Sequence, residues 1–152
     1  MGIKIDTSQF SRALAERKQA LHDAVRPAAQ AGAQELYIEA RLRAPVSAEA
    51  HYFYGSAAKA APKGQKKALS YLFQPGNLRD SIYQVYSKTN STAAKATYHV
   101  SWNASKAPYG HMVEFGTSRM PAHPFLRPAL LAAEPMIISA MRGEFLKRMT
   151  NA

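Results

Sequence analysis

Histidine and acidic side chains are the residues of this chain best suited to chemistry, because it contains no cysteine. The histidines are His22, His51, His99, His111 and His123. They are too widely spaced for a zinc pattern such as HExxH. His111 and Glu114 would share one face of a helix and supply half of a metal site, but a surface or strand pair explains the same spacing. We therefore expect no bound metal.

The sequence patterns of nucleotide binding and covalent catalysis do not occur. The chain has no GxGxxG, no phosphate-loop glycines and no GxSxG elbow. Asp80 and Glu114 are the acids nearest to turn-rich segments, yet neither has a base or a nucleophile beside it in the sequence. We expect no cofactor and no enzymatic activity.

Length and composition are those of an ordinary folded protein. The chain has 152 residues, of which 47% are hydrophobic and 20% charged, which predicts a single domain over residues 1–152. Its net charge of +10 favours either a polyanion such as DNA or an acidic protein partner. No signal-peptide or membrane-spanning run is visible, so we expect a soluble, unprocessed protein made in the cytoplasm, with no membrane partner.

A long amphipathic helix is predicted from Ser8 to about Arg43. Its apolar stripe is Phe10, Leu14, Leu21, Val25, Ala28, Gly32 and Leu36. Pro27 should kink this helix, but the stripe keeps its phase across the proline, which favours one bent helix over two. Ala44-Pro45 ends it.

Such a helix is longer than a compact domain of this size. About 35 residues at roughly 1.5 Å each span about 52 Å, whereas the domain should be about 40 Å across. We expect the uncovered part of the stripe to be buried against a neighbouring subunit. The alternative is that the kink folds the helix back onto the domain.

Residues 46–75 are predicted to form a long loop or arm, with a short helix near 65–72. Aromatic residues at 52–54 precede a lysine cluster formed by Lys59, Lys63, Lys66 and Lys67. These lysines could face DNA, since aromatic and basic side chains together suit a phosphate backbone or a single strand. A solvated loop, or an arm that docks on a neighbour, is the alternative.

Two strands are predicted at 82–87 and 96–102, joined by a turn at 90–92. Because two strands alone are marginal in water, we expect a third from 112–115 or from the neighbouring loop. A C-terminal helix should run from Phe125 to about Arg148, with Pro128 in its first turn and Pro135 bending or splitting it. The predicted fold is therefore α+β: a long kinked N-terminal helix, a small antiparallel β-sheet of three or more strands, and a C-terminal helix.

The segment from Tyr109 to Leu130 carries a resemblance to a known family. Residues 114–117 read Glu-Phe-Gly-Thr, and residues 124–130 read Pro-Phe-Leu-Arg-Pro-Ala-Leu. With the helix ending in Ala44-Pro45 and the Gly-Asn-Leu-Arg-Asp-Ser-Ile run at 76–82, this order resembles the gene-product-ten-like tail-completion or head–tail joining proteins of HK-type lambdoid phages. Two departures are Pro75, where the family commonly has threonine, and the much longer link at 46–74.

The resemblance implies a structural subunit of a ring, usually sixfold, in the neck of a long-tailed phage or prophage-derived particle. Its implied partners are other copies of itself, a head-side connector or stopper, a tail terminator or tube protein, and the genomic DNA that passes through the ring. Its implied location is the virion, after assembly in the host cytoplasm.

Physical reasons connect the motif to such a role. Gly116 can take a backbone conformation closed to other residues, and Thr117 can bond the turn through its hydroxyl. Pro121 stiffens the loop, while Phe115 and Phe125 are candidate anchors. Glu114 could pair with Arg119 or Arg127, within a subunit or across an interface. The predicted interface residues are Glu114, Phe115, Gly116, Thr117, Arg119, Pro121, Phe125 and Arg127.

A second function of a different class stays open at the level of sequence. The chain could be a free DNA-binding protein that uses the lysine cluster and its net charge of +10. It would then bind DNA tightly in solution with a steep dependence on salt.

Overall fold

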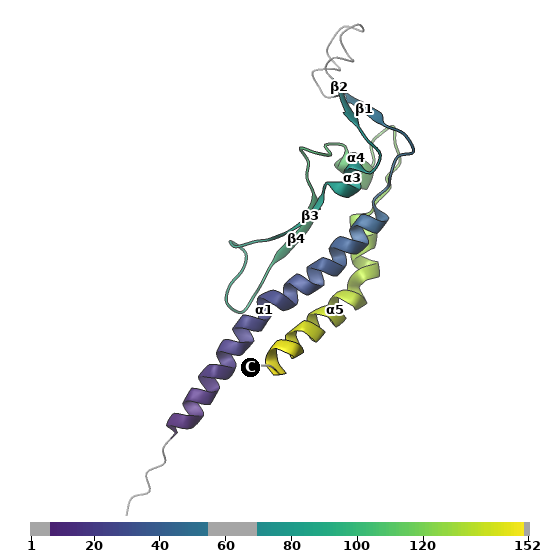
Figure 1. Cartoon of the computed structure of the whole chain (residues 1–152). Helices are drawn as coiled ribbons and strands as arrows, with labels where there is room; N and C mark the ends of the chain where they lie inside the picture. The colour runs from purple at the N-terminus through teal and green to yellow at the C-terminus, as the bar shows by residue number, and fades with distance from the viewer. Residues whose placement is uncertain (1–6, 55–69, 151–152) are drawn as a thin grey trace, which may run out of the picture. The chain divides into compact units, whose positions relative to one another are not determined.

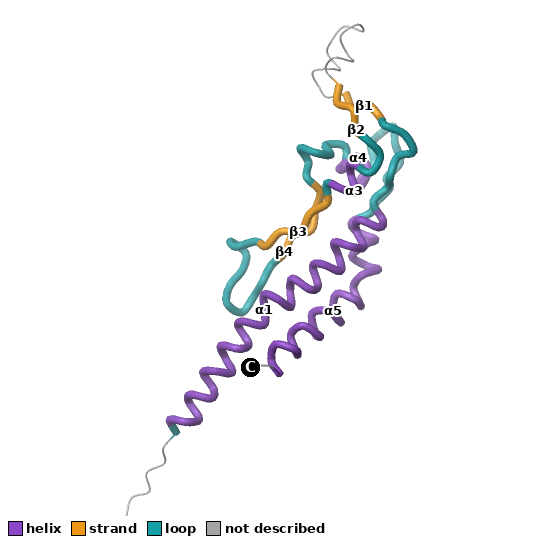
Figure 2. The backbone as a smooth tube through the Cα atoms, viewed as in Figure 1, coloured by secondary structure: helices purple, strands orange, loops and turns teal. Residues whose placement is uncertain are grey.

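The computed structural model describes residues 7–54 and 70–150 (Figure 1). Along the chain, the structure has helix α1 (Ser8–Arg43), strands β1 (His51–Tyr54) and β2 (Ser70–Phe73), helix α3 (Asn77–Asp80), strands β3 (Ile82–Tyr86) and β4 (Tyr98–Trp102), and helices α4 (Gly110–Phe115) and α5 (Leu126–Thr150). Figure 2 shows helices and strands in separate segments, as the predicted α+β class requires.

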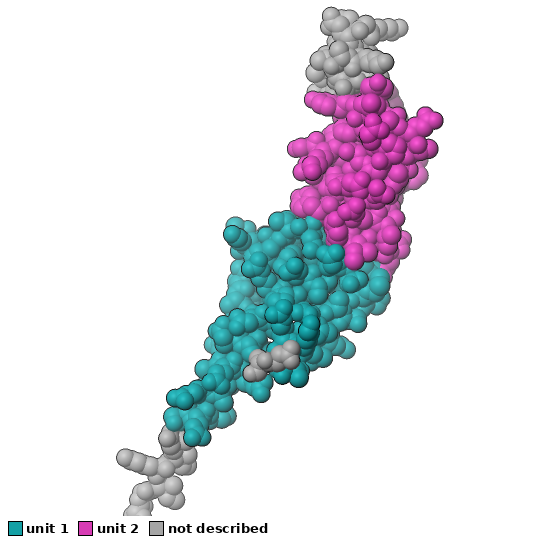
Figure 3. Space-filling view, in the orientation of Figure 1, with its two compact units in different colours: residues 1–36, 84–100, 133–152 teal, residues 37–83, 101–132 magenta. Residues whose placement is uncertain are grey.

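The chain divides into two compact units, coloured separately in Figure 3. Unit 1 contains residues 1–36, 84–100 and 133–152, and unit 2 contains residues 37–83 and 101–132. Helices α1 and α5 and both strands of the β3–β4 pair contribute residues to each unit. The expectation of a single domain stays a prediction.

Helix α1 is one continuous helix of 36 residues that includes Pro27, as the unbroken apolar stripe predicted. It ends at Arg43, one residue before Ala44-Pro45. In unit 1 its buried positions are small: Ala24 and Ala28 are almost fully covered, and Gly32 is buried as well. A Cβ at Gly32 would lie 2.6 Å from Met141 Cγ of α5, so the glycine allows the two helices to approach closely.

The strands β3 and β4 form an antiparallel pair, which confirms the two strands predicted there. In unit 1 this pair meets α1, because the Arg26 guanidinium lies 4.4 Å from the centre of the Tyr86 ring. The ring of Tyr86 also contacts that of Tyr98, at 5.4 Å between centroids. Within unit 1, this strand pair therefore contacts α1 through Arg26 and Tyr86.

The predicted third strand at 112–115 is wrong, since those residues belong to α4. A short apolar run does not distinguish strand from helix by its periodicity. Here helical bonds join Val113 N to Tyr109 O at 3.1 Å and Gly116 N to Met112 O at 2.9 Å. Within residues 7–54 and 70–150, the strands make two separate two-stranded sheets, not one sheet of three or more.

The arm at 46–75 is not wholly a loop, because β1 and β2 pair antiparallel at its base. His51 lies opposite Phe73 and Phe53 lies opposite Tyr71 in this register. Residues 70–72 are strand, so the short helix predicted at 65–72 is wrong there; aromatic side chains favour the paired strand. The rest of that helix and the four lysines at 59, 63, 66 and 67 lie outside the described residues.

Helix α5 runs unbroken through Pro128 in its first turn and Pro135 further on, so the second proline does not split it. The core of unit 2 forms around Phe125, which is completely buried and whose ring lies 5.9 Å from that of Trp102. Leu78 and Ile82 are also buried in this unit. None of the described helices has the length and apolar character that crossing a membrane requires.

Candidate assembly surfaces

A tight turn after α4 is fixed by its own backbone. Gly116 has φ 74° and ψ −178°, a conformation that is essentially restricted to glycine, as the sequence predicted. A Cβ at this position would lie 2.8 Å from the backbone nitrogen of Ala122. Thr117 and Met120 then pair through their backbones, with Thr117 N donating to Met120 O at 2.8 Å. The loop therefore has one defined shape.

The hydroxyl of Thr117 completes this turn by accepting from the backbone N–H groups of Arg119 and Met120, at 3.3 and 3.1 Å. Such a hydroxyl bond is the role predicted for Thr117. All residues from Thr117 to Pro124 are exposed. The turn thus presents side chains outward on a rigid backbone, which lowers the entropic cost of binding a partner.

Glu114 holds the start of α5. The residue is 7% exposed, and its carboxylate accepts from the backbone N–H groups of Phe125 at 2.7 Å, Leu126 at 3.1 Å and Arg127 at 3.3 Å. These N–H groups have no partner inside the helix, and a negative charge at this end is also favoured by the helix dipole. Glu114 therefore fixes where α5 leaves the turn.

Within the described chain, Glu114 does not pair with the side chain of Arg119 or Arg127, and a pairing across an interface stays a prediction. The carboxylate takes the backbone of residue 127, and no ion pair joins it to either arginine within the described ranges. The backbone N–H groups of residues 125–127 compete with the arginine side chains for this carboxylate. They are the preferred partners because an ion pair would leave them without an acceptor. The described residues also hold no group of three or more potential metal ligands.

The predicted interface residues fall into three groups by burial. Glu114 and Phe125 are buried within unit 2, so they shape the surface without forming it. Gly116 is half-buried at the turn. The exposed members are Phe115, Thr117, Arg119, Pro121 and Arg127. Phe115 is 66% exposed, which is unusual for so large an apolar side chain and makes it the strongest candidate anchor of the group.

The run at 76–82 ties the same unit together. Asp80 accepts from the guanidinium groups of Arg41 at 2.8 Å and Arg79 at 3.0 Å, and the bond from Arg79 holds the pKa of Asp80 below its usual value. Asn77 donates to the carbonyl of Lys106 at 2.7 Å, and Ser81 donates to the carbonyl of Leu78 at 2.7 Å. These bonds explain why polar residues stand at these positions of the motif.

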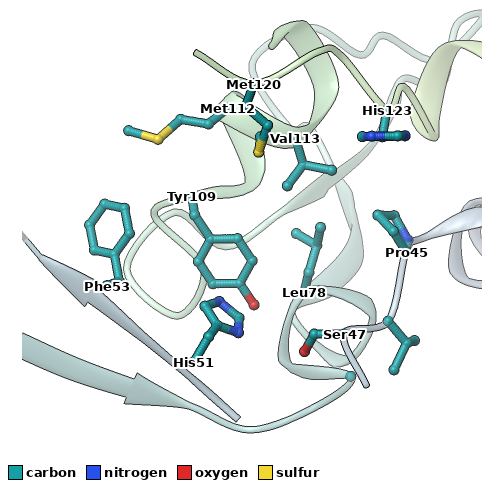
Figure 4. Close-up of a pocket in the computed structure, with 12 residues that line it drawn as sticks. Pro45, Ser47, His51, Phe53, Leu78, Tyr109, Met112, Val113, Met120 and His123 are labelled. Carbon is teal, nitrogen blue, oxygen red and sulfur yellow. The ribbon is translucent and has the colours of Figure 1, made fainter. Parts of the chain in front are cut away.

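An apolar pocket of about 460 Å³ lies in unit 2, beside the turn (Figure 4). Its wall includes His51 and Phe53 from β1, Leu78 from α3, Tyr109, and Val113 from α4. The rings of His51 and Tyr109 meet edge to face at 5.0 Å. His51 Nδ1 is buried and has no hydrogen-bond partner among the described residues, so the pocket retains one unsatisfied polar atom.

No local sequence pattern predicts this pocket, because its wall comes from segments far apart in the chain. The aromatic residues at 52–54 are the one available signal, and their place beside the lysine cluster favours a DNA-facing or docking arm instead. Only the pairing of β1 with β2 brings His51 and Phe53 against Tyr109.

The first part of α1 presents an uncovered apolar stripe. Residues 7–19 are all exposed, including Phe10 at 70% and Leu14 at 59%, and Leu21 is 42% exposed. The first buried position is Ala24. Helical segments of this length are marginal in water unless an apolar face is packed. This part of the helix therefore needs a cover that the described residues do not provide.

The exposed turn, the uncovered helix stripe and the apolar pocket are surfaces of the kind that bind partner proteins. The family comparison agrees: the model of the family described as "Bacteriophage HK97-gp10, putative tail-component" matches residues 8–116. The chain belongs to this family, as the motifs predicted, and is therefore a structural phage tail component. No curated protein and no solved structure matches the chain.

Proposed function

We propose that this protein is a ring-forming subunit in the neck of a long-tailed phage or prophage-derived particle. In this role it joins the head-side connector or stopper to the tail terminator or tube and leaves a passage for DNA. The membership of the tail-component family over residues 8–116 carries this proposal. A joining ring needs rigid surfaces and partners but no chemistry, so the protein acts without catalysis.

Three physical features support a ring. The uncovered stripe of α1 suits burial against a neighbour, and a neighbour of the same kind at a fixed rotation closes into a ring. The net charge of +10 per chain suits a passage for a polyanion, because several copies around DNA would be neutralised by its phosphates. The exposed Phe115 and Arg119 are side-chain types common at interface centres.

The test is an image of the protein in its particle. Electron microscopy of purified particles should place a ring of this protein between head and tail, and particles made without it should leave heads and tails unjoined. Native mass spectrometry of the purified protein should show a discrete oligomer or stable binding to isolated connectors. A protein that stays monomeric and never joins particles would refute the proposal.

The free DNA-binding protein is the other candidate. Its lysine cluster lies outside the described residues, so no contact in the described part of the chain favours it over the ring. Tight, salt-sensitive binding to DNA by a protein that is absent from particles would support this alternative.

A further inference from the structure

The loop that joins β3 to β4 carries an unbalanced positive charge. Residues 81–113 contain Lys88, Lys95 and Lys106 but no aspartate or glutamate, in a chain with ten acidic residues. Lys88 and Lys95 both lie in the loop at 87–97, and both are exposed. Neither belongs to an ion pair within residues 7–54 and 70–150. The loop therefore offers two cations that no described carboxylate neutralises.

Helix α1 does not cancel this charge where it meets the loop. Within unit 1, Thr92 of the loop shares the wall of a pocket of about 330 Å³ with Asp23 and Arg26 of α1. The guanidinium of Arg26 lies over the Tyr86 ring, next to the start of the loop. One carboxylate and one guanidinium leave the charge of the two lysines unchanged, so this part of unit 1 stays positive.

The backbone of the loop is held by its own polar side chains. Figure 2 shows the loop as a long excursion beyond the ends of β3 and β4. Ser91 Oγ donates to the carbonyl of Ser87 at 2.6 Å and accepts from the N–H of Thr97 at 2.9 Å. The N–H of Thr92 donates to the carbonyl of Lys95 at 2.7 Å. The lysines are thus presented from a defined backbone, which lowers the entropic cost of binding a partner.

The side chains exposed on this loop suit a phosphate backbone better than a protein surface. They are Lys88, Thr89, Asn90 and the Thr-Ala-Ala-Lys run at 92–95. Lysine, threonine and asparagine are among the side chains that contact DNA phosphates. The cores of protein interfaces are instead rich in aromatic side chains and poor in lysine. The loop contains no aromatic residue on which an unpaired base could stack, which favours a duplex over a single strand.

We propose that the β3–β4 loop, residues 87–97, is a contact site for the phosphate backbone of duplex DNA, with Lys88 and Lys95 as its cations. Such contacts are independent of sequence, because phosphates carry no base information. The inference deepens the proposed function, on which it rests only for the source of the DNA, the genome that passes through the ring. Its lysines are not those of the arm.

The first experiment removes the two lysines from the full chain. Lys88→Ala with Lys95→Ala should make the slope of log affinity against log salt shallower by about 1.8, from about 0.9 for each lost phosphate contact. Fluorescence anisotropy with a labelled duplex measures this slope. The matched control, Lys18→Ala with Lys106→Ala, removes the same charge from two other exposed positions and should keep the wild-type slope.

Two results of this experiment would overturn the inference. If the loop variant keeps the wild-type slope, its lysines do not contact phosphates. If both variants lose the same slope, the effect belongs to the net charge and not to the loop. A wild type without measurable affinity for the duplex at low salt would overturn the inference as well.

A footprint on the unaltered protein avoids any effect of substitution on folding. An acetylating reagent modifies exposed lysines, and mass spectrometry of the peptides reports the extent at each site. Duplex DNA at saturating concentration should protect Lys88 and Lys95 several-fold and leave Lys18 unchanged. High salt should remove this protection. Loop lysines that react equally with and without the duplex would contradict the proposal.

The same footprint separates this inference from the proposed function. In particles that contain DNA, Lys88 and Lys95 should react less than in emptied particles. If the protein is absent from particles, the ring is refuted, while protection by the duplex in solution still supports the loop contact. If the protein is present and both lysines react alike in full and empty particles, the ring stands and the loop contact is wrong.

Discussion

At the scale of single residues, Glu114 connects the turn to the last helix. One carboxylate accepts from three consecutive backbone N–H groups across a separation of 11 to 13 residues. The N–H groups belong to the first residues of α5, which have no acceptor within the helix. Glu114 precedes the exposed Phe115 in the motif. It therefore supports the backbone from which Phe115 projects.

Replacing Glu114 by alanine should lower the free energy of unfolding by about 3 kcal/mol, because three N–H groups lose their acceptor in a poorly hydrated place. Glu114→Gln keeps one acceptor oxygen and should cost about half as much. Urea denaturation followed by circular dichroism measures both. Glu134→Ala, at an exposed position of α5, should change stability by less than about 0.5 kcal/mol. An unchanged stability for Glu114→Ala would contradict the capping role.

Gly116 is the second residue with a specific conformational role. Gly116→Ala should destabilise the protein by about 2 kcal/mol, because φ 74° with ψ −178° is closed to alanine and its Cβ would meet the Ala122 backbone. Thermal unfolding measures the loss. Thr117→Val should cost less, since it removes a hydroxyl from an exposed turn. If both variants unfold at the wild-type temperature, the turn is not held as described.

At the scale of elements, the contact between α1 and α5 in unit 1 depends on a small residue. Gly32 lets Met141 and Ile137 approach within 2.6 to 3.0 Å of the place where its Cβ would be. This glycine stands in the apolar stripe predicted from the sequence. In unit 1, the space beside it is filled by Met141 and Ile137 of α5.

Gly32→Leu should destabilise the helix pair by about 2 kcal/mol through overpacking. Gly143→Ala is the matched control on α5, where nothing lies within 4 Å of a new Cβ. It should stabilise the protein by up to about 1 kcal/mol, because alanine is the better helix former. Denaturant titration of both variants gives the two values. Equal effects with the same sign would show that α1 and α5 do not meet at Gly32.

At the scale of the whole molecule, the net charge bears on the proposed contacts with other copies and with DNA. The chain has 20 basic and 10 acidic residues, and four of the lysines fall in one short stretch of the arm. A ring that passes DNA needs weak, sequence-independent attraction, since tight binding would hold the genome in place. A free DNA-binding protein would need the opposite.

Replacing the four arm lysines, Lys59, Lys63, Lys66 and Lys67, by alanine separates these roles. If the arm meets DNA, the slope of log affinity against log salt should become shallower by up to about 3.6, from 0.9 for each lost phosphate contact. Fluorescence anisotropy with labelled duplex DNA at several salt concentrations measures the slope. Oligomerisation should be unchanged if these lysines face DNA and not a neighbouring subunit. An unaltered slope would place the arm away from DNA.

The sequence alone determined the elements whose signals are local. The periodicity of the apolar stripe predicted α1 through Pro27 to about Arg43. Aromatic and β-branched residues predicted β3, and alternation predicted β4. The glycine at 116 was expected to adopt a restricted conformation, and it does. The order of the motifs indicated the family, because such motifs are recognised from the residues alone, without their contacts.

Only the tertiary structure decided which side chains meet. Residues 112–115 could be strand or helix until their hydrogen bonds were seen, and Glu114 had several possible partners until the start of α5 lay beside it. The pocket combines β1, α3 and α4, which are distant in sequence, so no local pattern could predict it. Secondary structure follows from backbone and hydrophobic preferences of neighbouring residues, which a local pattern shows. Surfaces and pockets depend on contacts between residues that are distant in the sequence, and no local pattern shows which of these will meet.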